Sequence, residues 1–164
     1  MAIEERVGDA LRDRGESIAA AESCTGGLVG SLLTDVPGAS DYFDRSVVTY
    51  SYDAKLETLG VPRERLDDEG AVSEPVAREM ARGVRDAAGV TWAVATTGIA
   101  GPTGGSDDKP VGTVFVATAH AGAWGSGDSW CSVERYVFDG TRTEIRRQIA
   151  ERALEDLLGA IETE

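Results

Sequence analysis

The chain has 164 residues, a net charge of −13 and 41% hydrophobic residues. This length predicts one globular domain, residues 1–164, with enough apolar side chains for a sizeable core. The acidic balance excludes nucleic acid and anionic membranes as partners, because their phosphates would be repelled.

Cysteine and histidine are scarce in the sequence. Two cysteines and one histidine exclude a disulfide scaffold, a Cys-cluster zinc site and any multi-histidine metal site. The N-terminal segment 1–15 is charged where a secretory signal would be apolar, and no long apolar run follows, so we expect a cytoplasmic protein. Acidic excess with only two lysines resembles the surfaces of proteins from salt-loving organisms.

The chain begins with a helix, which is followed by a strand, a turn and a second helix. Apolar residues recur at helical spacing over residues 3–11, and Gly15 ends this helix. A short buried strand is expected over residues 17–21. The glycine turn 22–27 follows, and Thr25 can cap the next helix. This arrangement aims backbone N–H groups at an anion.

The middle of the chain alternates strands and helices. A strand is expected over residues 46–51, a short helix over 54–60 and a turn over 61–63. A longer helix opens at Ser73 and ends before Gly89.

The C-terminal half predicts three strands and one helix. The strands cover residues 92–97, 112–119 and 130–138, and the last two pair with each other. A capping box, Thr141 with Glu144, starts the final helix. Helices alternating with strands, then a strand pair, indicate an α/β layered fold with a mixed sheet.

The turn after the first strand is the first candidate site. A side chain there lies near backbone donors, which suits a nucleophile such as Ser23 and its oxyanion. The alternative is that Ser23 and Thr25 only cap the helix. Cys24 is a competing nucleophile, although a small buried cysteine packing behind the turn is the commoner case.

The second candidate is the segment around Tyr50 and Lys55. A phenol or an amine can act as a base for a serine only if its pKa falls, which burial and a nearby cation would achieve for the amine. Lys55 stands out because the chain otherwise uses arginine, yet a solvated lysine on a short helix is the simpler reading.

The third candidate is a glycine-rich segment, residues 97–105, with Lys109 shortly after. Glycines, hydroxyls and a lysine suit a nucleotide's phosphate or ribose. The segment matches neither the phosphate-loop nor the dinucleotide fingerprint, so a flexible surface loop is the alternative. His120 follows an apolar strand and is expected at a strand end or turn.

Together these segments resemble the CinA C-terminal domain family over essentially the whole chain. The blocks that carry the resemblance, in order, are Ala21-Glu22-Ser23-Cys24-Thr25-Gly26-Gly27, Val48-Thr49-Tyr50-Ser51 with Ala54-Lys55, Gly70-Ala71-Val72-Ser73-Glu74-Pro75-Val76, Thr97-Gly98-Ile99-Ala100-Gly101-Pro102 with Gly104-Gly105, and Lys109-Pro110-Val111-Gly112-Thr113.

The resemblance implies a three-layer α/β/α sandwich that is commonly dimeric. It also implies the activity of the family's stand-alone members, nicotinamide-nucleotide amidohydrolases, which convert nicotinamide mononucleotide to nicotinate mononucleotide and ammonia in pyridine nucleotide salvage. No metal or organic cofactor is implied. Larger members carry an added domain linked to ADP-ribose pyrophosphatase activity, which we do not expect here.

The resemblance also assigns roles to residues. Ser23 matches the nucleophile, and Tyr50 and Lys55 match the polar partners that would activate it, without deciding which of them is the base. The residues expected around the nucleotide are Thr25, Gly26, Gly27, Thr97, Gly98, Ile99, Ala100, Gly101, Gly104, Gly105 and Lys109. A non-catalytic nucleotide-binding module, with Ser23 as a helix cap, is the alternative function.

Overall fold

The computed structural model describes all 164 residues and contains one five-stranded sheet. The strand order is β2-β1-β3-β4-β5, and β2, β1 and β3 run parallel while β4 and β5 are antiparallel to their neighbours. The bounds are β1 Ile18–Glu22, β2 Phe43–Val48, β3 Trp92–Gly98, β4 Thr113–His120 and β5 Trp130–Val137. The predicted mixed sheet is confirmed.

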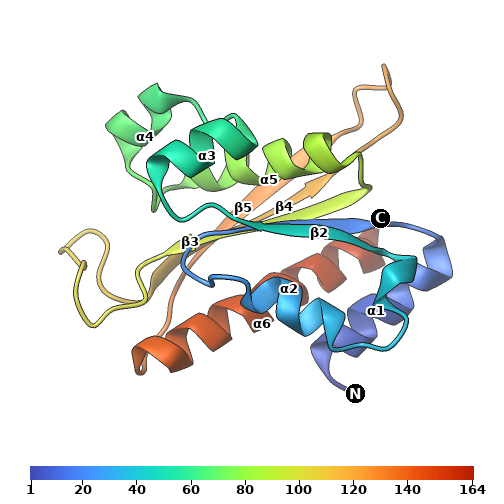
Figure 1. Ribbon diagram of the computed structural model, residues 1–164, viewed down its shortest axis with the longest axis horizontal. Coiled ribbons are helices and arrows are strands. Elements are labelled where there is room, and N and C mark those ends of the chain that lie inside the picture. Colours follow the sequence, from blue (N-terminus) through green and yellow to red (C-terminus); the bar gives the residue numbers. More distant parts are fainter.

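Six α-helices cover both faces of this sheet, as Figure 1 shows. On one face lie α1 (Ile3–Arg14), α2 (Leu28–Thr34) and α6 (Arg142–Thr163), and on the other lie α3 (Tyr52–Leu59), α4 (Arg63–Glu69) and α5 (Glu74–Ala88). This is the three-layer α/β/α sandwich that the family resemblance implies. None of the helices combines the length and apolar character needed to cross a lipid bilayer.

The central strand β1 is buried on both faces and separates two apolar cores. Ile18 and Ala20 pack in the core under α1, α2 and α6, while Ala19 and Ala21 pack in the core under α5. Because successive side chains of a strand point to opposite faces, Glu22 continues the row of Ile18 and Ala20 toward α2.

Two predicted boundaries were wrong in the middle of the chain. The second strand is Phe43–Val48, so it begins and ends three residues before the predicted 46–51, and residues 49–51 lead into α3. A helix, α4, occupies residues that were predicted as a turn and the segment after it, and Leu66 is its one buried residue.

The order of the strands creates a switch point at the carboxyl edge of the sheet. The chain leaves β1 toward α2 on one face and leaves β2 toward α3 on the other, while β3 returns to the opposite side of β1. Open α/β sheets bind ligands at such edges, where loops diverge from parallel strands. All three candidate segments of the sequence begin at this edge.

Candidate active site at the carboxyl edge of the parallel strands

Ser23 directly follows β1 and is held to the neighbouring strand. Its backbone N–H donates to the Thr96 carbonyl at 3.1 Å, which extends the β1–β3 ladder by one residue. The side chain is buried, with 8% of the residue exposed. Ser23 therefore lies at a fixed place on the switch-point edge.

Lys55 reaches Ser23 from α3, on the face of the sheet toward which Ala19, Ala21 and Ser23 point. Ser51 caps α3 by accepting from the Ala54 N–H, and this sets the helix that carries Lys55. The Lys55 Nζ atom donates to Ser23 Oγ at 2.9 Å and to the carbonyl oxygens of Thr49 and Tyr50 at 2.6 and 3.1 Å. The lysine side chain is completely buried.

The environment of Lys55 makes its ammonium group easier to deprotonate than that of an exposed lysine. Burial lowers the pKa of Lys55 from 10.5 to about 8, and the Cys24 thiolate, where it forms, opposes this shift. No carboxylate forms an ion pair with Lys55, so no opposite charge of this kind offsets the desolvation of its ammonium group. A serine hydrogen-bonded to an amine whose pKa is lowered to about 8 has the geometry of a nucleophile with its base.

The turn after Ser23 is organised by Glu22 and not by a capping hydroxyl. Glu22 is fully buried, and its carboxylate accepts from the N–H groups of Gly27, Val29 and Gly30 at 3.1, 2.9 and 3.0 Å. It also accepts from the hydroxyl of Ser46. Glu22 thus supplies the side-chain cap of α2, whose own N-cap residue is a glycine.

The prediction that Thr25 caps this helix is therefore wrong, and the same holds for Ser23. The Thr25 hydroxyl donates to Glu22 at 2.7 Å and lies 2.8 Å from the Thr96 hydroxyl. Glu22, five positions before the N-cap residue Gly27, caps α2 instead, because its side chain points toward that helix. Ser23 is left free for the contact with Lys55.

Tyr50 is brought near the pair through its backbone only. Its carbonyl accepts from Lys55, whereas the residue is 61% exposed and its hydroxyl accepts from Arg142 Nη2 at 3.3 Å. The structure gives the Tyr50 hydroxyl no hydrogen bond to Ser23. Of the two sequence candidates for the base, Lys55 is the one in contact with the serine.

Cys24 faces the apolar core behind the turn. Only 6% of it is exposed, and burial raises the pKa of its thiol to about 12. A thiol with this pKa is protonated at neutral pH and is a poor nucleophile. The packing role considered for Cys24 agrees with this placement.

The glycine-rich segment follows β3 and lies partly at the site and partly away from it. The Thr97 hydroxyl donates to the Ala71 carbonyl at 2.8 Å, and the Gly101 carbonyl accepts from Arg142 Nη1 at 2.7 Å. Gly104 and Gly105 are exposed, and the Lys109 ammonium donates to the Glu69 carbonyl at 3.3 Å. Lys109 makes no contact with Ser23 or Lys55.

His120 lies at the far end of the sheet. It ends β4 opposite Trp92, the first residue of β3, and its ring lies 4.4 Å from that of Trp92 and 5.8 Å from that of Trp130. The expected strand-end position is confirmed. No three His, Cys, Asp or Glu side chains come together as a metal site.

Three residues at the site received no role from the sequence: Glu22, Arg142 and Arg146. Arg146 donates to the carbonyl oxygens of Cys24 and Thr25 at 3.0 and 2.9 Å. Arg142 and Arg146 are one helical turn apart in α6, so both reach the same loops. A charged residue at the end of an apolar strand was the available signal for Glu22.

Backbone donors remain near Ser23. The Gly26 N–H donates to the Ser23 carbonyl, and the Gly27 N–H donates to the Glu22 carboxylate. The N–H groups of Cys24 and Thr25 donate to no other group of the chain. The Ile99 N–H donates to the Thr113 carbonyl, and the Ile99 carbonyl accepts from Gly112, so Ile99 faces β4. Successive N–H groups of a strand point to opposite sides, so the Gly98 N–H points toward β1.

Comparisons with known proteins identify the family of this chain. The model of the CinA C-terminal domain matches residues 1–161. The chain is 49% identical to the nicotinamide-nucleotide amidohydrolase PncC of Shigella flexneri over 157 residues, which cover 96% of this chain and 92% of that protein. It is 51% identical over 154 residues to a CinA-like protein of Chlorobium limicola, covering 94% of this chain but only 35% of that longer protein.

Solved structures show the same fold. A CinA superfamily protein of Klebsiella pneumoniae superposes with a TM-score of 0.91 at 34% identity, covering 99% of this chain and 97% of that one. The competence/damage-inducible protein CihA of Agrobacterium tumefaciens gives a TM-score of 0.89 at 40% identity, with 98% and 93% covered. The chain belongs to the CinA C-terminal domain family.

Proposed function

We propose that the protein is a nicotinamide-nucleotide amidohydrolase that converts nicotinamide mononucleotide to nicotinate mononucleotide and ammonia. The observation that carries the proposal is the buried hydrogen bond of 2.9 Å between Lys55 Nζ and Ser23 Oγ. The relatives named for this activity match the chain over nearly its whole length. All 164 residues serve as one amidohydrolase domain.

In the first half of the reaction, Ser23 is acylated. The neutral amine of Lys55 takes the Ser23 proton as Oγ forms a bond to the carboxamide carbon, and the carbonyl electron pair moves to oxygen. When the carbonyl re-forms, the C–N bond breaks and the Lys55 ammonium protonates the departing nitrogen. Ammonia leaves, and the nicotinoyl group stays on Ser23 as an ester.

In the second half, water cleaves this ester. Lys55 accepts a proton from the attacking water and returns it to Ser23 Oγ as the acyl–oxygen bond breaks. Nicotinate mononucleotide leaves as a carboxylate after its acid proton passes to solvent. No metal or organic cofactor takes part in these steps.

The developing oxyanion needs donors that are not already used. The two predicted sources of donors are the turn 25–27 and the pair Thr97-Gly98. Among them, the N–H groups of Thr25 and Gly98 donate to no other group of the chain, and the Cys24 N–H beside them is also available. Loss of one such donor typically raises the barrier by about 3 kcal/mol. The turn residues Gly26 and Gly27 serve by holding this geometry.

The glycine-rich segment is proposed to hold the nucleotide. Its members are Thr97, Gly98, Ile99, Ala100, Gly101, Gly104 and Gly105, and they follow β3 at the edge where Ser23 lies. Lys109 supports this segment through its bond to the Glu69 carbonyl. The non-catalytic alternative required Ser23 to be a helix cap, and Glu22 fills that role instead.

The test is release of ammonia from nicotinamide mononucleotide. Wild-type protein is expected to turn over, and Ser23→Ala, with unchanged circular dichroism and thermal unfolding, is expected to lose more than about 10³-fold in rate. Acid quenching during turnover should leave a nicotinoyl mass increment on the peptide that contains Ser23. A chain that binds the mononucleotide without releasing ammonia would contradict the enzyme and support the binding module.

We further propose that the reaction serves pyridine nucleotide salvage in the cytoplasm of a cell with high internal salt, and that the chain acts as a homodimer. The excess of acidic residues and the scarcity of lysine support the salt adaptation. Activity and sedimentation should be measured from low salt to about 2 M KCl, where the Debye length falls below about 3 Å. An enzyme that is monomeric throughout, or inactivated by salt, would contradict these two points.

A further inference from the structure

A groove lies on the α6 side of the sheet, at the edge formed by β5. Its volume is about 470 Å³, which is in the range of small-molecule sites. β5 is the last strand of the sheet, and α6 packs mainly on β3 and β4, so the α6 side of β5 is left uncovered. Asp156 in this groove follows Arg146 by about 15 Å of helix, so the groove is separate from the site of Ser23 and Lys55.

Small residues of α6 create the hollow. Gly159 and Ala160 face the groove, while β5 contributes the larger side chains of Trp130 and Tyr136. A Cβ atom at Gly159 would have no other atom within 4 Å. A larger side chain at this position would therefore enter the groove without displacing the surrounding structure.

Asp156 gives the groove a half-buried negative charge. Both of its carboxylate oxygens accept from the Tyr136 hydroxyl at 2.9 Å, and burial raises its pKa. Glu134 and Glu155 line the same groove, and of these acidic residues only Glu155 forms an ion pair, with Arg152 at 3.2 Å. Salt adaptation accounts for exposed carboxylates, but it gives no reason to bury Asp156 without an ion-pair partner.

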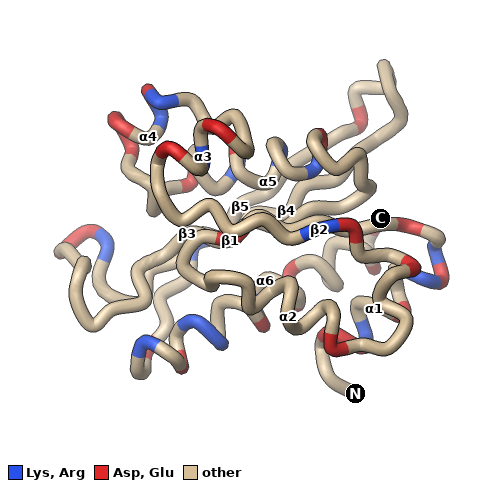
Figure 2. Tube along the Cα trace, viewed as in Figure 1, with Lys and Arg blue, Asp and Glu red and all other residues tan.

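The C-terminal part of α6 adds to this negative field. After Arg152 the charged residues of the helix are all acidic, namely Glu155, Asp156 and Glu162. The C-terminus of a helix carries a negative partial charge that favours cations nearby. Figure 2 shows the basic positions of α6 gathered toward its start, at the lower left, and acidic positions farther along. This end of the groove therefore attracts a positively charged group.

Thr118 contributes a buried hydroxyl without a partner. Only 3% of the residue is exposed, and its side chain lines the groove from β4. Its hydroxyl forms no hydrogen bond within the chain, although buried polar side chains are nearly always paired. Ser132, which lies opposite Thr118 on β5, also has no hydrogen-bond partner for its hydroxyl. These two hydroxyls indicate that a polar ligand completes the wall.

Trp130 supplies an aromatic wall. The residue is half-buried, and its ring lies 5.8 Å from that of Trp92 in an edge-on arrangement that fixes its position. An aromatic surface of this kind can pack against an alkyl chain and attracts cations.

The polar groups that face the groove can all accept hydrogen bonds. A carboxylate has about four acceptor sites, and the single Tyr136 hydroxyl leaves Asp156 with acceptor sites to spare. Guanidinium and ammonium groups provide N–H donors together with a positive charge, and their hydrogen bonds to carboxylates are strong. We propose that the groove binds a small organic cation with N–H donors, of the alkylguanidinium or alkylamine class. Asp156 is its carboxylate partner, Thr118 accepts one of its N–H groups, and Trp130 packs against its alkyl chain.

The test is calorimetric titration with two cations. Agmatine carries a guanidinium at one end of an alkyl chain and an ammonium at the other, whereas tetramethylammonium is a cation without N–H donors. The titrations are made in about 1 M KCl, where a Debye length of about 3 Å suppresses general attraction by the net charge of −13. Wild-type protein is expected to bind one agmatine per chain, and tetramethylammonium at least about 10-fold more weakly.

Two variants change the groove in different ways. Gly159→Leu fills it and should weaken agmatine binding by about 20-fold or more, with a thermal unfolding temperature no lower than that of wild type, because leucine favours the helix over glycine. Asp156→Asn should weaken binding by about 10-fold or more. Glu151→Gln is the matched control, because it removes the same charge from α6 at a residue that pairs with Arg147 outside the groove. It should stay within about twofold of wild type.

Several results would overturn the proposal. They are the absence of agmatine binding by wild-type protein, equal affinity for both cations, unchanged binding by Gly159→Leu, and equal weakening by Asp156→Asn and Glu151→Gln. Sedimentation provides a further check: a wild-type dimer that Gly159→Leu dissociates would show that a second copy of the chain covers the groove, and this would also overturn it. None of these measurements requires turnover, so they are independent of whether the protein releases ammonia from the mononucleotide.

Discussion

Lys55 Nζ lies 2.9 Å from Ser23 Oγ, and the two buried residues come from α3 and from the position directly after β1. The lysine has no carboxylate partner, so its charge is destabilised by burial alone. This one contact determines which residue can act as base and at what pH it can act.

The rate should rise with pH as Lys55 loses its proton. Burial lowers the pKa of Lys55 to about 8, so the fraction of neutral amine increases up to that pH and then levels. We expect kcat/KM for the mononucleotide to increase through a single ionisation near pH 8 and to reach a plateau above it. Lys55→Met should lose more than about 10³-fold at every pH. The range from about pH 6 to about pH 9 brackets the lowered pKa of Lys55. A rate that stays constant over this range would contradict a lysine base.

The same pKa predicts how stability changes with pH. The unfolded state has the ordinary lysine pKa of 10.5, so between about 8 and 10.5 it binds more protons than the folded state. The free energy of unfolding of wild type, measured relative to Lys55→Met, should therefore increase across this window by at most about 1.4 kcal/mol per pH unit. Urea unfolding of both proteins at neutral pH and near pH 10 measures the difference. A relative stability that falls with rising pH would show that the folded-state pKa is not lowered.

Tyr50→Phe separates the two candidates for the base. The substitution keeps the carbonyl that accepts from Lys55 and removes only the hydroxyl that accepts from Arg142. We expect kcat to stay within about threefold of wild type, because the base is untouched. A loss of kcat comparable with that of Lys55→Met would instead make the tyrosine hydroxyl a catalytic group.

The sequence predicted the local elements around Ser23 but not the side chains that hold the turn after it. The strand, glycine turn and helix around Ser23 follow from local patterns, and the family resemblance supplied Lys55. The cap of α2 could not be predicted, because capping patterns are local and Glu22 reaches the helix from the strand before the turn. Arg142 and Arg146 contact loops about a hundred residues away in sequence, and no local rule contains such contacts.

The errors in the fold arise where burial is partial. β2 is an edge strand in which Asp44 and Arg45 are exposed, so the apolar alternation that marks a strand is weak at its start. α4 carries the single buried residue Leu66 among charged neighbours, and its periodicity is too short to distinguish from a turn. The buried strands β1, β3 and β4 were predicted to within one residue at each end.

Cys24→Ala tests whether the thiol takes part. Because the pKa of Cys24 is raised to about 12 and the side chain is buried, we expect the variant to retain most of the wild-type rate and iodoacetamide to leave wild type active. Removing the buried sulfur should still cost about 1–2 kcal/mol in the free energy of unfolding. Cys131→Ala is the matched control, since Cys131 is the other free cysteine and is only half-buried. Rapid inactivation by iodoacetamide that Cys24→Ala abolishes would make the cysteine the nucleophile.

Glu22→Gln tests whether the buried carboxylate holds the turn that carries Ser23. The carboxylate accepts five hydrogen bonds, from the hydroxyls of Thr25 and Ser46, from the N–H of the N-cap residue Gly27 and from two backbone N–H groups of α2. An amide has the same shape, but its NH₂ group must face donors, so at least one buried N–H loses its acceptor. We expect the free energy of unfolding to fall by about 2–4 kcal/mol. The rate should fall as well, because the displaced turn moves Ser23 relative to Lys55.

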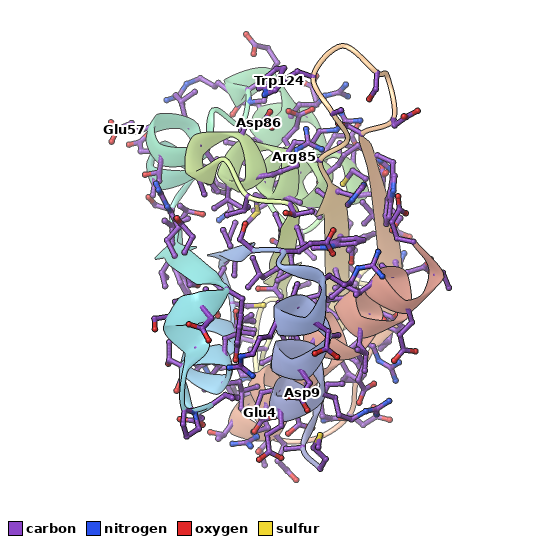
Figure 3. All side chains as sticks on the ribbon, turned by 90° about the vertical axis from the view of Figure 1, so that its right-hand side faces the viewer. Glu4, Asp9, Glu57, Arg85, Asp86 and Trp124 are labelled. Atoms are coloured by element: carbon purple, nitrogen blue, oxygen red, sulfur yellow. The ribbon has the colours of Figure 1, made fainter.

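Glu57→Gln is the control for this change, because Glu57 lies on α3 and projects into solvent, as Figure 3 shows. Its effect on stability should stay within about 0.5 kcal/mol. Chemical unfolding of both variants beside wild type measures the difference, and Ser46→Ala, which removes one donor and leaves the carboxylate, should fall between them. If Glu22→Gln and Glu57→Gln were equally stable, the turn would be held by its glycines and by Arg146, and the carboxylate would be dispensable for the position of Ser23.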